Sequence, residues 1–306
     1  MACIKCGKKA YEAGFCREHF VEYLEKKVRY TIRKFSLLGK GERIAVAASG
    51  GKDSTTVLYM LKKFGYDVEA FMVEPGIKGY TDENARVLAK VCEDNAIPLT
   101  VISVKDEFGR DLAGIQGALR AKGVEMQDCA VCGVLKRYLL NKACRGFDVV
   151  ATGHTMDDEA QAFLMNVFRN DTKQVYRGGP RNAGGQAGDK FVPRIKPLYL
   201  CKEGETRAYS KALGFPVNYG RCPCSRDAYR KNFRDFLDAM EAKHPNVKDN
   251  VVQFYLSEFY GMGLDDGRAR PSSRAGSAPK LCSECGEPSS GGTCKACQII
   301  GHLKAY

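Results

Sequence analysis

The stretch RIAVAASGGKDS at residues 43–54 decides the fold. Its first half is a short apolar run typical of a buried strand, and a helical pattern of apolar residues begins at Lys52. The two glycines between them let the backbone approach a ligand closely. A phosphate group would fit here, because it could bind to inward-pointing amides, the start of a helix, Lys52 and the flanking serine hydroxyls. The Walker A pattern is absent, and an ordinary turn between a strand and a helix is the alternative.

Outward from this stretch, strands alternate with helices. Further strands are predicted at 68–73, 99–104 and 147–152, and helices at 17–36, 52–64, 82–95, 133–145, 157–168, 204–213, 225–242 and 248–260. Such alternation predicts an α/β fold: a Rossmann-like parallel sheet with right-handed crossovers and ligands at the carboxyl ends of its strands. Residues 114–128 are expected to form a loop or insert above the sheet, and the glycine-rich, basic stretch 170–197 a loop.

Composition narrows the class of protein. The chain has 306 residues, of which 44% are hydrophobic and 27% charged, which excludes a wholly disordered or fibrous chain. It has no run of 18 apolar residues and no secretory leader pattern at its start, so we expect a cytoplasmic protein without membrane association. The formal charge of +12 favours a polyanionic partner, nucleic acid above all. A merely basic soluble protein is the alternative.

Four segments are expected along the chain. Residues 1–36 form an N-terminal zinc knuckle and a basic helix, whose charges are either a solvated face or an RNA-facing surface. Residues 37–260 form the sheet domain, residues 261–280 a flexible linker and residues 281–306 a C-terminal zinc ribbon.

The chain has 14 cysteines, a number that in a reducing compartment favours metal binding or chemistry over disulfides. Two sets at the chain ends have the spacing of closed tetrahedral zinc sites, C-x2-C-x9-C-x2-H and C-x2-C-x8-C-x2-C. Small buried hydrophobes are the alternative, and it is weak because polar turns surround both sets. The expected zinc ligands are Cys3, Cys6, Cys16 and His19, and Cys282, Cys285, Cys294 and Cys297.

A third group of cysteines is Cys129 and Cys132, with Cys222 far downstream. From spacing alone, they could be a redox pair, or could hold an iron–sulfur cluster with one iron free of protein ligands. Cys92, Cys144 and Cys201 are expected in the core. Cys224, two residues after Cys222, stays ambiguous.

The hexapeptide SGGKDS after an apolar strand resembles the phosphate loop of the PP-loop ATP pyrophosphatase family. These enzymes cleave ATP between its α- and β-phosphates and leave AMP on a carbonyl oxygen. Residues 153–160, GHTMDDEA, resemble the family's second signature, again after a strand. Capping of the following helix is the alternative for Asp157 and Asp158.

Taken together, the motifs indicate a narrower group within this family. The PP-loop, C-x2-C-G-x2-K-R-Y at 129–138, the second signature, Cys222-Pro223 and the terminal knuckles occur in this order along nearly the whole chain. The set resembles the TtuA-type tRNA 2-thiouridine synthetases and their cytosolic thiolase relatives. The resemblance implies a [4Fe–4S] cluster on Cys129, Cys132 and Cys222, whose fourth iron binds the sulfur to be transferred.

The resemblance also implies the remaining site residues. Lys136 and Asp158 match positions held to be catalytic, and Lys136 lies one helical turn after Cys132, on the same face. A solvent-exposed helical lysine is the alternative for Lys136. The positions that match ATP contacts are Ala47, Ser49, Gly50, Gly51, Lys52, Asp53, Ser54, Val73, Lys136 and Gly153.

The implied reaction activates a tRNA uridine. Its O2 attacks the α-phosphorus of ATP with Mg²⁺ on the phosphates, and sulfide then displaces AMP from C2. Relatives modify uridine 54 or the wobble uridine 34, use a ubiquitin-like sulfur carrier or free sulfide, and are commonly homodimers. Two alternatives stand beside this hypothesis: another PP-loop tRNA-modifying or amidating ligase without a cluster, and a non-enzymatic zinc-knuckle RNA-binding protein.

Overall fold

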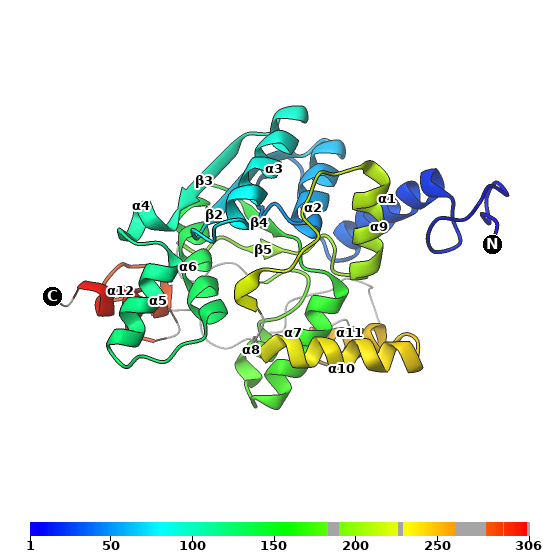
Figure 1. Cartoon of the computed structure of the whole chain (residues 1–306). Helices are drawn as coiled ribbons and strands as arrows, with labels where there is room; N and C mark the ends of the chain where they lie inside the picture. Colours follow the sequence, from blue (N-terminus) through cyan, green and yellow to red (C-terminus); the bar gives the residue numbers. More distant parts are fainter. Residues whose placement is uncertain (183–189, 226–228, 261–279, 290, 305–306) are drawn as a thin grey trace.

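A five-stranded parallel sheet forms the centre of the protein (Figure 1). The structure is a computed structural model that describes residues 1–182, 190–225, 229–260, 280–289 and 291–304. The strand order is β3-β2-β1-β4-β5. The strands are β1 (Arg43–Ala47), β2 (Asp67–Glu74), β3 (Leu99–Ser103), β4 (Val149–Thr152) and β5 (Arg194–Ile195). The predicted parallel α/β fold is thereby confirmed.

Both faces of the central strand β1 are buried, as its apolar sequence requires. In β1, Ile44 and Val46 pack into one hydrophobic cluster and Ala45 into another, on the opposite face. The first cluster includes α1 (Arg17–Lys34), α2 (Lys52–Lys63) and α9 (Glu203–Leu213). The apolar face of α1 therefore belongs to the main core, although the helix precedes the first strand.

Two stretches predicted to be irregular are in fact ordered. The stretch 114–128, expected to be a loop or an insert, is not a loop over most of its length, because α5 (Leu112–Ala121) buries Leu112, Ile115 and Leu119. The expected loop at 170–197 contains α8 (Thr172–Tyr176) and the edge strand β5, which pairs with β4. Glycines obscured the helix, and a strand of two residues has no periodicity of its own.

The remaining helices lie around the sheet (Figure 1). They are α3 (Thr81–Asp94), α4 (Val104–Phe108), α6 (Asp128–Ala143), α7 (Met156–Phe168), α10 (Tyr229–Lys243) and α11 (Val247–Glu258). Helix α6 begins five residues before the predicted start at 133, so Cys129 and Cys132 both lie within it. The predicted helix at 225–242 begins at Tyr229 among the described residues.

The C-terminal knuckle consists of β6 (Lys280–Leu281), β7 (Pro288–Ser289) and α12 (Lys295–Lys304). Figure 1 shows α12 beside α5 and α6, which it contacts. Nearly all of the expected linker, at 261–279, lies outside the described residues. None of the helices in the described part of the chain combines the length and the apolar character that a membrane span requires.

Candidate active site and metal centres

Strand β1 and helix α2 are joined by the PP-loop, which its own hydroxyls hold in shape. The Ser54 hydroxyl accepts a hydrogen bond from the Ser49 amide at 3.0 Å, and donates to the Gly51 carbonyl at 3.1 Å. The hydroxyls of Ser49 and Ser54 are 3.2 Å apart. The loop is thus closed on itself at the first turn of α2, where helix amides favour an anion.

Glycine is required at position 50 for two reasons. Its φ is +73°, and a Cβ there would lie 2.3 Å from the backbone oxygen of Asn84 on α3. Gly51 has ordinary backbone angles, and a Cβ there would meet only the Ser49 hydroxyl, at 3.4 Å. The loop therefore packs directly on α3 through Gly50, whereas a Cβ at Gly51 would make only an ordinary contact within the loop.

Lys52 lies in a network of carboxylates. Its Nζ is 2.7 Å from Asp53 Oδ2 and 2.9 Å from Glu203 Oε1, at the start of α9. Burial by itself would lower the pKa of Lys52, but the two carboxylates outweigh it and raise the pKa. Burial raises the pKa of Asp53, against the opposing effect of Lys52. Lys52 is therefore a charged ammonium, held by two carboxylates beside the phosphate loop.

The second signature packs against the first. A Cβ at Gly153 would lie 2.7 Å from the backbone nitrogen of Ser54, so this close approach requires glycine. The two family motifs therefore share one surface at the carboxyl ends of β1 and β4. Ala47 ends β1, and Val73 lies near the end of the adjacent β2, so these expected ATP contacts lie at the same edge.

The two aspartates of the second signature have different partners. Asp157 is buried, where it accepts from Lys248 Nζ at 2.6 Å and from the Glu203 amide at 2.7 Å. Asp158 caps α7, since its Oδ2 accepts from the Thr155 amide at 3.0 Å. The helix-cap interpretation thus describes part of what Asp158 does.

The second oxygen of Asp158 faces an arginine. Asp158 Oδ1 is 3.5 Å from Arg230 Nη1. Burial by itself would raise the pKa of Asp158, but His154, Arg230 and the Thr155 amide outweigh it and lower the pKa. The carboxylate is therefore ionised at neutral pH, and Oδ1 is its less engaged oxygen.

The cysteine group lies at the start of α6. Cys129 and Cys132 are one turn apart, and the Cys129 thiol donates to the Cys224 carbonyl at 2.9 Å, which joins the short helix η2 (Pro223–Ser225) to α6. Burial and the neighbouring Cys222 raise the pKa of Cys129, whereas Lys136 lowers it. Burial likewise raises the pKa of Cys132 and Lys136 opposes it. Lys136 therefore lies near the thiols.

Tyr80 connects this cysteine group with the phosphate loop. Burial raises the pKa of Tyr80, the charge of Cys222 adds to the rise, and Lys52 opposes it. Tyr80 also interacts with Asn84, the residue that packs on Gly50. A backbone bridge between Gly51 and Asn218, four residues before Cys222, also joins the loop to the segment that leads to the cysteine group. The two groups therefore border the same region of the molecule.

Three half-buried thiols, two in the first turns of α6 and one immediately before η2, fit an iron–sulfur cluster. Within the described ranges, only the two terminal sets bring all their ligand atoms within 4.8 Å of one another. The wider spacing of Cys129, Cys132 and Cys222 suits a cluster of several irons better than a single small ion. Thiolates are also the usual ligands of such clusters.

The terminal sets have the compactness of single-ion sites. Cys3 and Cys16 Sγ are each 3.4 Å from His19 Nδ1, and Cys6 Sγ is 3.7 Å from Cys16 Sγ. In the C-terminal set, Cys285 and Cys294 Sγ are 3.7 Å apart. Burial opposes ionisation of Cys282, but backbone amides outweigh it and lower its pKa to about 6. Four N/S ligands without an open position suit structural zinc.

The cysteines outside these sets differ in burial. Cys92, Cys144 and Cys201 are buried in the apolar clusters, as expected. Cys224 is half-buried, and burial together with Cys222 raises its pKa to about 11.

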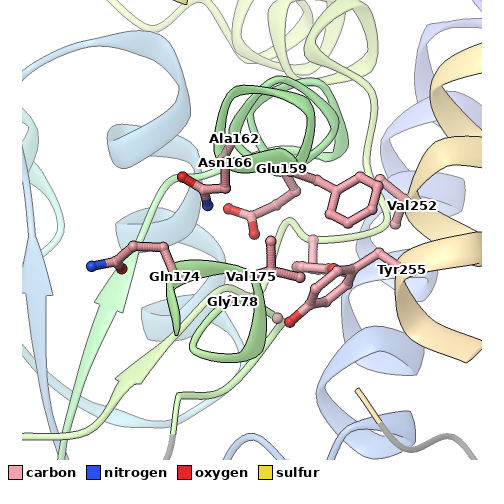
Figure 2. Close-up of a pocket in the computed structure, with 11 residues that line it drawn as sticks. Glu159, Ala162, Asn166, Gln174, Val175, Gly178, Val252 and Tyr255 are labelled. Carbon is pink, nitrogen blue, oxygen red and sulfur yellow. The ribbon is translucent and has the colours of Figure 1, made fainter. Parts of the chain in front are cut away.

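A small cavity lies between α7, α8 and α11 (Figure 2). Its volume is about 30 Å³, which is room for a water molecule and too little for a nucleotide. Glu159 and Asn166 of α7 and Tyr255 of α11 point into it. The buried Tyr255 hydroxyl has no hydrogen-bond partner among the described residues, so a water fits here.

A larger groove, of about 340 Å³, separates α6 and β5 from the C-terminal knuckle. Arg137, Arg194 and Lys295 line it. Burial lowers the pKa of Arg194, and the charge of Arg137 lowers it further. The acidic lining residue, Glu287, is already paired with Arg145. The groove therefore carries excess positive charge and suits an anion.

Comparison with known proteins gives the family. Residues 23–216 match the family model described as the PP-loop domain. The tRNA-5-methyluridine(54) 2-sulfurtransferase of Pyrococcus horikoshii is 36% identical over 312 residues, which cover 99% of this chain and 95% of that protein. This chain belongs to the PP-loop tRNA 2-sulfurtransferase family.

Other similar proteins agree with this family assignment. The tRNA 2-thiolation protein NcsA of Haloferax volcanii is 31% identical over 336 residues, which cover both chains completely. The solved structure of the U34-tRNA thiolase NcsA from Methanococcus maripaludis with its [4Fe–4S] cluster has a TM-score of 0.79 and 29% identity, and covers 100% of this chain and 97% of that one.

Several residues of this sulfurtransferase-family site have no signal in the sequence. Glu203 and Lys248 reach the PP-loop and Asp157 from far along the chain, and Tyr80 borders both groups. The only sequence signal for Arg230 is the excess of positive charge in the segment around it, YRKNFR at 229–234. Their positions follow from tertiary packing, which no local pattern encodes.

Proposed function

We propose that this chain is an ATP-dependent tRNA sulfurtransferase that makes 2-thiouridine. The single observation that carries the proposal is the backbone bridge between Gly51 of the PP-loop and Asn218, four residues before Cys222, so that the segment leading to the cysteine group runs beside the loop. Activation by a nucleotide and delivery of sulfur require these two groups to adjoin one substrate. Membership of the tRNA 2-sulfurtransferase family supports the same activity.

ATP would bind along the carboxyl edge of the sheet. The residues proposed for it run from Ala47 through the loop of 49–54 to Val73, Lys136 and Gly153. Lys52 and Lys136 would neutralise charge that develops on the phosphates. Mg²⁺ commonly binds one or two carboxylates together with substrate phosphates, and Asp158 Oδ1 is the oxygen best able to contribute.

The chemistry follows from this placement. The uridine O2 attacks the α-phosphorus, the bond to the β-phosphate oxygen breaks, and pyrophosphate leaves. The adenylated oxygen then leaves C2 as AMP when sulfur forms its bond there. Cys129, Cys132 and Cys222 are proposed to hold a [4Fe–4S] cluster, which, when bound, supplies an iron position for the sulfur to be transferred.

The rest of the chain would bind and position tRNA. We propose the same segments as the sequence predicts: a knuckle and basic helix in 1–36, the catalytic domain in 37–260, a linker in 261–280 and a zinc ribbon in 281–306. Two Zn²⁺ ions would occupy the terminal sets. RNA phosphates suit the excess positive charge of the groove between α6 and the ribbon. A cytoplasmic homodimer is the expected form.

Anaerobic purification tests the proposal. The protein should contain iron and acid-labile sulfide besides zinc, and should form 2-thiouridine, AMP and pyrophosphate from tRNA, ATP and a sulfur source. Cys129→Ala, Cys132→Ala and Cys222→Ala should each abolish thiolation, and Cys92→Ala, in the core, serves as the control. Full thiolation by all three variants would refute the cluster. ATP-dependent modification without iron indicates a cluster-free ligase, and RNA binding without AMP indicates a binding protein.

Two details are decided by the same preparation. Mass spectrometry of nucleosides from defined tRNA fragments locates the sulfur at uridine 54 or uridine 34. Comparison of free sulfide with a thiocarboxylated ubiquitin-like carrier identifies the donor. Only a productive donor yields AMP and 2-thiouridine together.

A further inference from the structure

The groove between α6, β5 and the C-terminal knuckle is a preformed site, because the buried Asn141 of α6 joins its walls. The Asn141 amide donates to the Lys190 carbonyl at 2.7 Å and to Glu287 of the knuckle at 2.9 Å. Its oxygen accepts from the Val192 amide at 3.4 Å. The groove has a volume of about 340 Å³, which is the size of a small-ligand site. A single nucleotide can enter such a space, whereas an RNA duplex cannot.

Three cations line this groove: Arg137, Arg194 and Lys295. Arg194 Nη2 lies 3.5 Å from the Arg137 carbonyl, so the side chain of Arg194 reaches from β5 to α6. Within the described ranges, none of the three has a carboxylate partner. The acidic lining residue, Glu287, already pairs with Arg145. An anionic ligand in the groove would therefore meet positive charge that no neighbouring carboxylate neutralises.

The groove also offers aromatic rings and a free amide. Tyr138 lines it and packs against two apolar clusters, which fix the ring in place. Phe191 lines it too, is half-buried, and belongs to none of the apolar clusters of the described residues. Gln174 lies at the border with the small cavity, and Figure 2 shows its amide directed away from that cavity. In the described part of the chain, this side-chain amide forms no hydrogen bond.

This combination of side chains is the one that recognises an unstacked nucleotide. Cations bind its phosphate, an aromatic ring stacks on its base, and an amide binds the edge of the base. A bare phosphate would need the cations alone, so it would leave Phe191 and Gln174 without a role.

An extended peptide fits the groove less well, because the outer edge of β5 is already occupied. The Asn182 amide donates to the Arg194 carbonyl at 3.1 Å, and Asn182 Oδ1 accepts from the Arg194 amide at 2.6 Å. The Lys196 amide donates to the Pro180 carbonyl at 2.9 Å. A peptide that extends a sheet needs these backbone groups to be free. The groove therefore presents side chains, rather than a strand edge, to its ligand.

The position of the groove relates it to the reacting uridine. Arg137 lies five residues beyond Cys132 on α6, which is about 8 Å along the helix axis. We propose that the groove binds one unpaired nucleotide of the tRNA close to the uridine that reacts, with its phosphate on the two arginines and its base against Phe191. This inference deepens the proposed function and rests on it, because it takes RNA as the substrate.

Binding of short RNA to the full-length, zinc-loaded protein tests this inference. The probe is a fluorescently labelled RNA of about a dozen nucleotides, either single-stranded or paired with its complement. A saturating nonhydrolysable ATP analogue keeps the probe out of the PP-loop. Phe191→Leu removes the ring and keeps an apolar side chain, so it should weaken binding of the single strand about tenfold, as the loss of one stacked base does. Binding of the duplex should not change.

A second variant and a control accompany Phe191→Leu. Gln174→Ala, at an exposed position, should weaken binding of the single strand several-fold and spare the duplex. Phe236→Leu, which changes an exposed phenylalanine on α10, should bind both probes as the wild type does. Zinc content and circular dichroism verify that each variant is folded.

The outcomes separate this inference from the function. Wild-type affinity of both groove variants for the single strand would overturn it. An equal loss for single strand and duplex would also overturn it, because the groove would then bind phosphate without a base. Release of the single strand by a short peptide with a free carboxylate would assign the groove to a protein tail instead. These measurements need no catalysis, whereas an iron-loaded protein that forms no 2-thiouridine contradicts the proposed function itself.

Discussion

The side-chain amide of Asn141 on α6 donates a hydrogen bond, 2.9 Å long, to the carboxylate of Glu287 in the C-terminal knuckle. Glu287 is 5% exposed and also pairs with Arg145, just beyond the end of α6. The same Asn141 amide donates to the Lys190 carbonyl at 2.7 Å. A buried carboxylate thus anchors the knuckle to the helix that carries the cysteine pair.

Removal of this anchor should loosen the knuckle. Glu287→Ala removes the acceptor of the Arg145 guanidinium and one of the two acceptors of the Asn141 amide, so we expect a loss of about 1–3 kcal/mol in unfolding free energy. Denaturant unfolding measures this loss, and zinc analysis should show that the ion is retained. Glu284→Ala, at an exposed position of the same knuckle, is the control and should change stability little. Equal effects of the two substitutions would contradict the anchor.

The PP-loop offers a matched pair of substitutions. Gly50→Ala should destabilise the protein and weaken ATP binding, because the new Cβ meets the Asn84 carbonyl at 2.3 Å and the backbone keeps a positive φ. Gly51→Ala meets only a hydroxyl at 3.4 Å and should leave the melting temperature nearly unchanged. Thermal unfolding with and without ATP distinguishes the two. If Gly50→Ala melts as the wild type does, α3 does not constrain the loop.

Asp158 should make stability depend on pH on the acid side. Its pKa is lower in the folded protein than in the unfolded chain, so its stabilisation is present above the unfolded value of about 4. That stabilisation is lost as pH falls through the folded pKa. In Asp158→Asn, the deficit in unfolding free energy should therefore be largest near neutral pH and shrink in acid. Urea unfolding across this range, with Asp82→Asn on the exposed start of α3 as the control, measures it.

The groove beneath the knuckle should govern the salt dependence of RNA binding. Arg137→Gln and Arg194→Gln should each reduce the slope of log affinity against log salt by about one, for any tRNA sequence. Fluorescence anisotropy with labelled tRNA at several salt concentrations gives the slopes. Lys90→Gln, which removes an exposed lysine paired with Asp94 on α3, is the control. Unchanged slopes in both arginine variants would place the RNA elsewhere.

Much of the fold follows from local sequence. The apolar runs of β1 to β4 predict the parallel sheet, and the glycines after β1 and β4 predict the edge where Gly153 meets the PP-loop. Helix α5 was obscured because Gly114 and Gly117 weaken a helical pattern that packing against α6 restores. The pair β4–β5 depends on a neighbouring strand rather than on periodicity.

The candidate site, like the fold, is predictable from local sequence only in part. Spacing predicts the two terminal sets, whose atoms the structure does bring together, because each set lies in short, local turns. The contact of Lys52 with Glu203 and that of Asp157 with Lys248 join residues far apart in the chain. No periodic pattern encodes such contacts, since they depend on how α9 packs on α2 and α11 packs on α7.

The backbone contact between Gly153 and Ser54 has a consequence for engineering and for evolution. Because the two turns are in mutual contact with no space for a methyl group, neither can be transplanted into another scaffold or lengthened by a residue without a compensating change in its counterpart. Recombination that separates 43–54 from 149–160 should yield chimaeras that lose both turns at once.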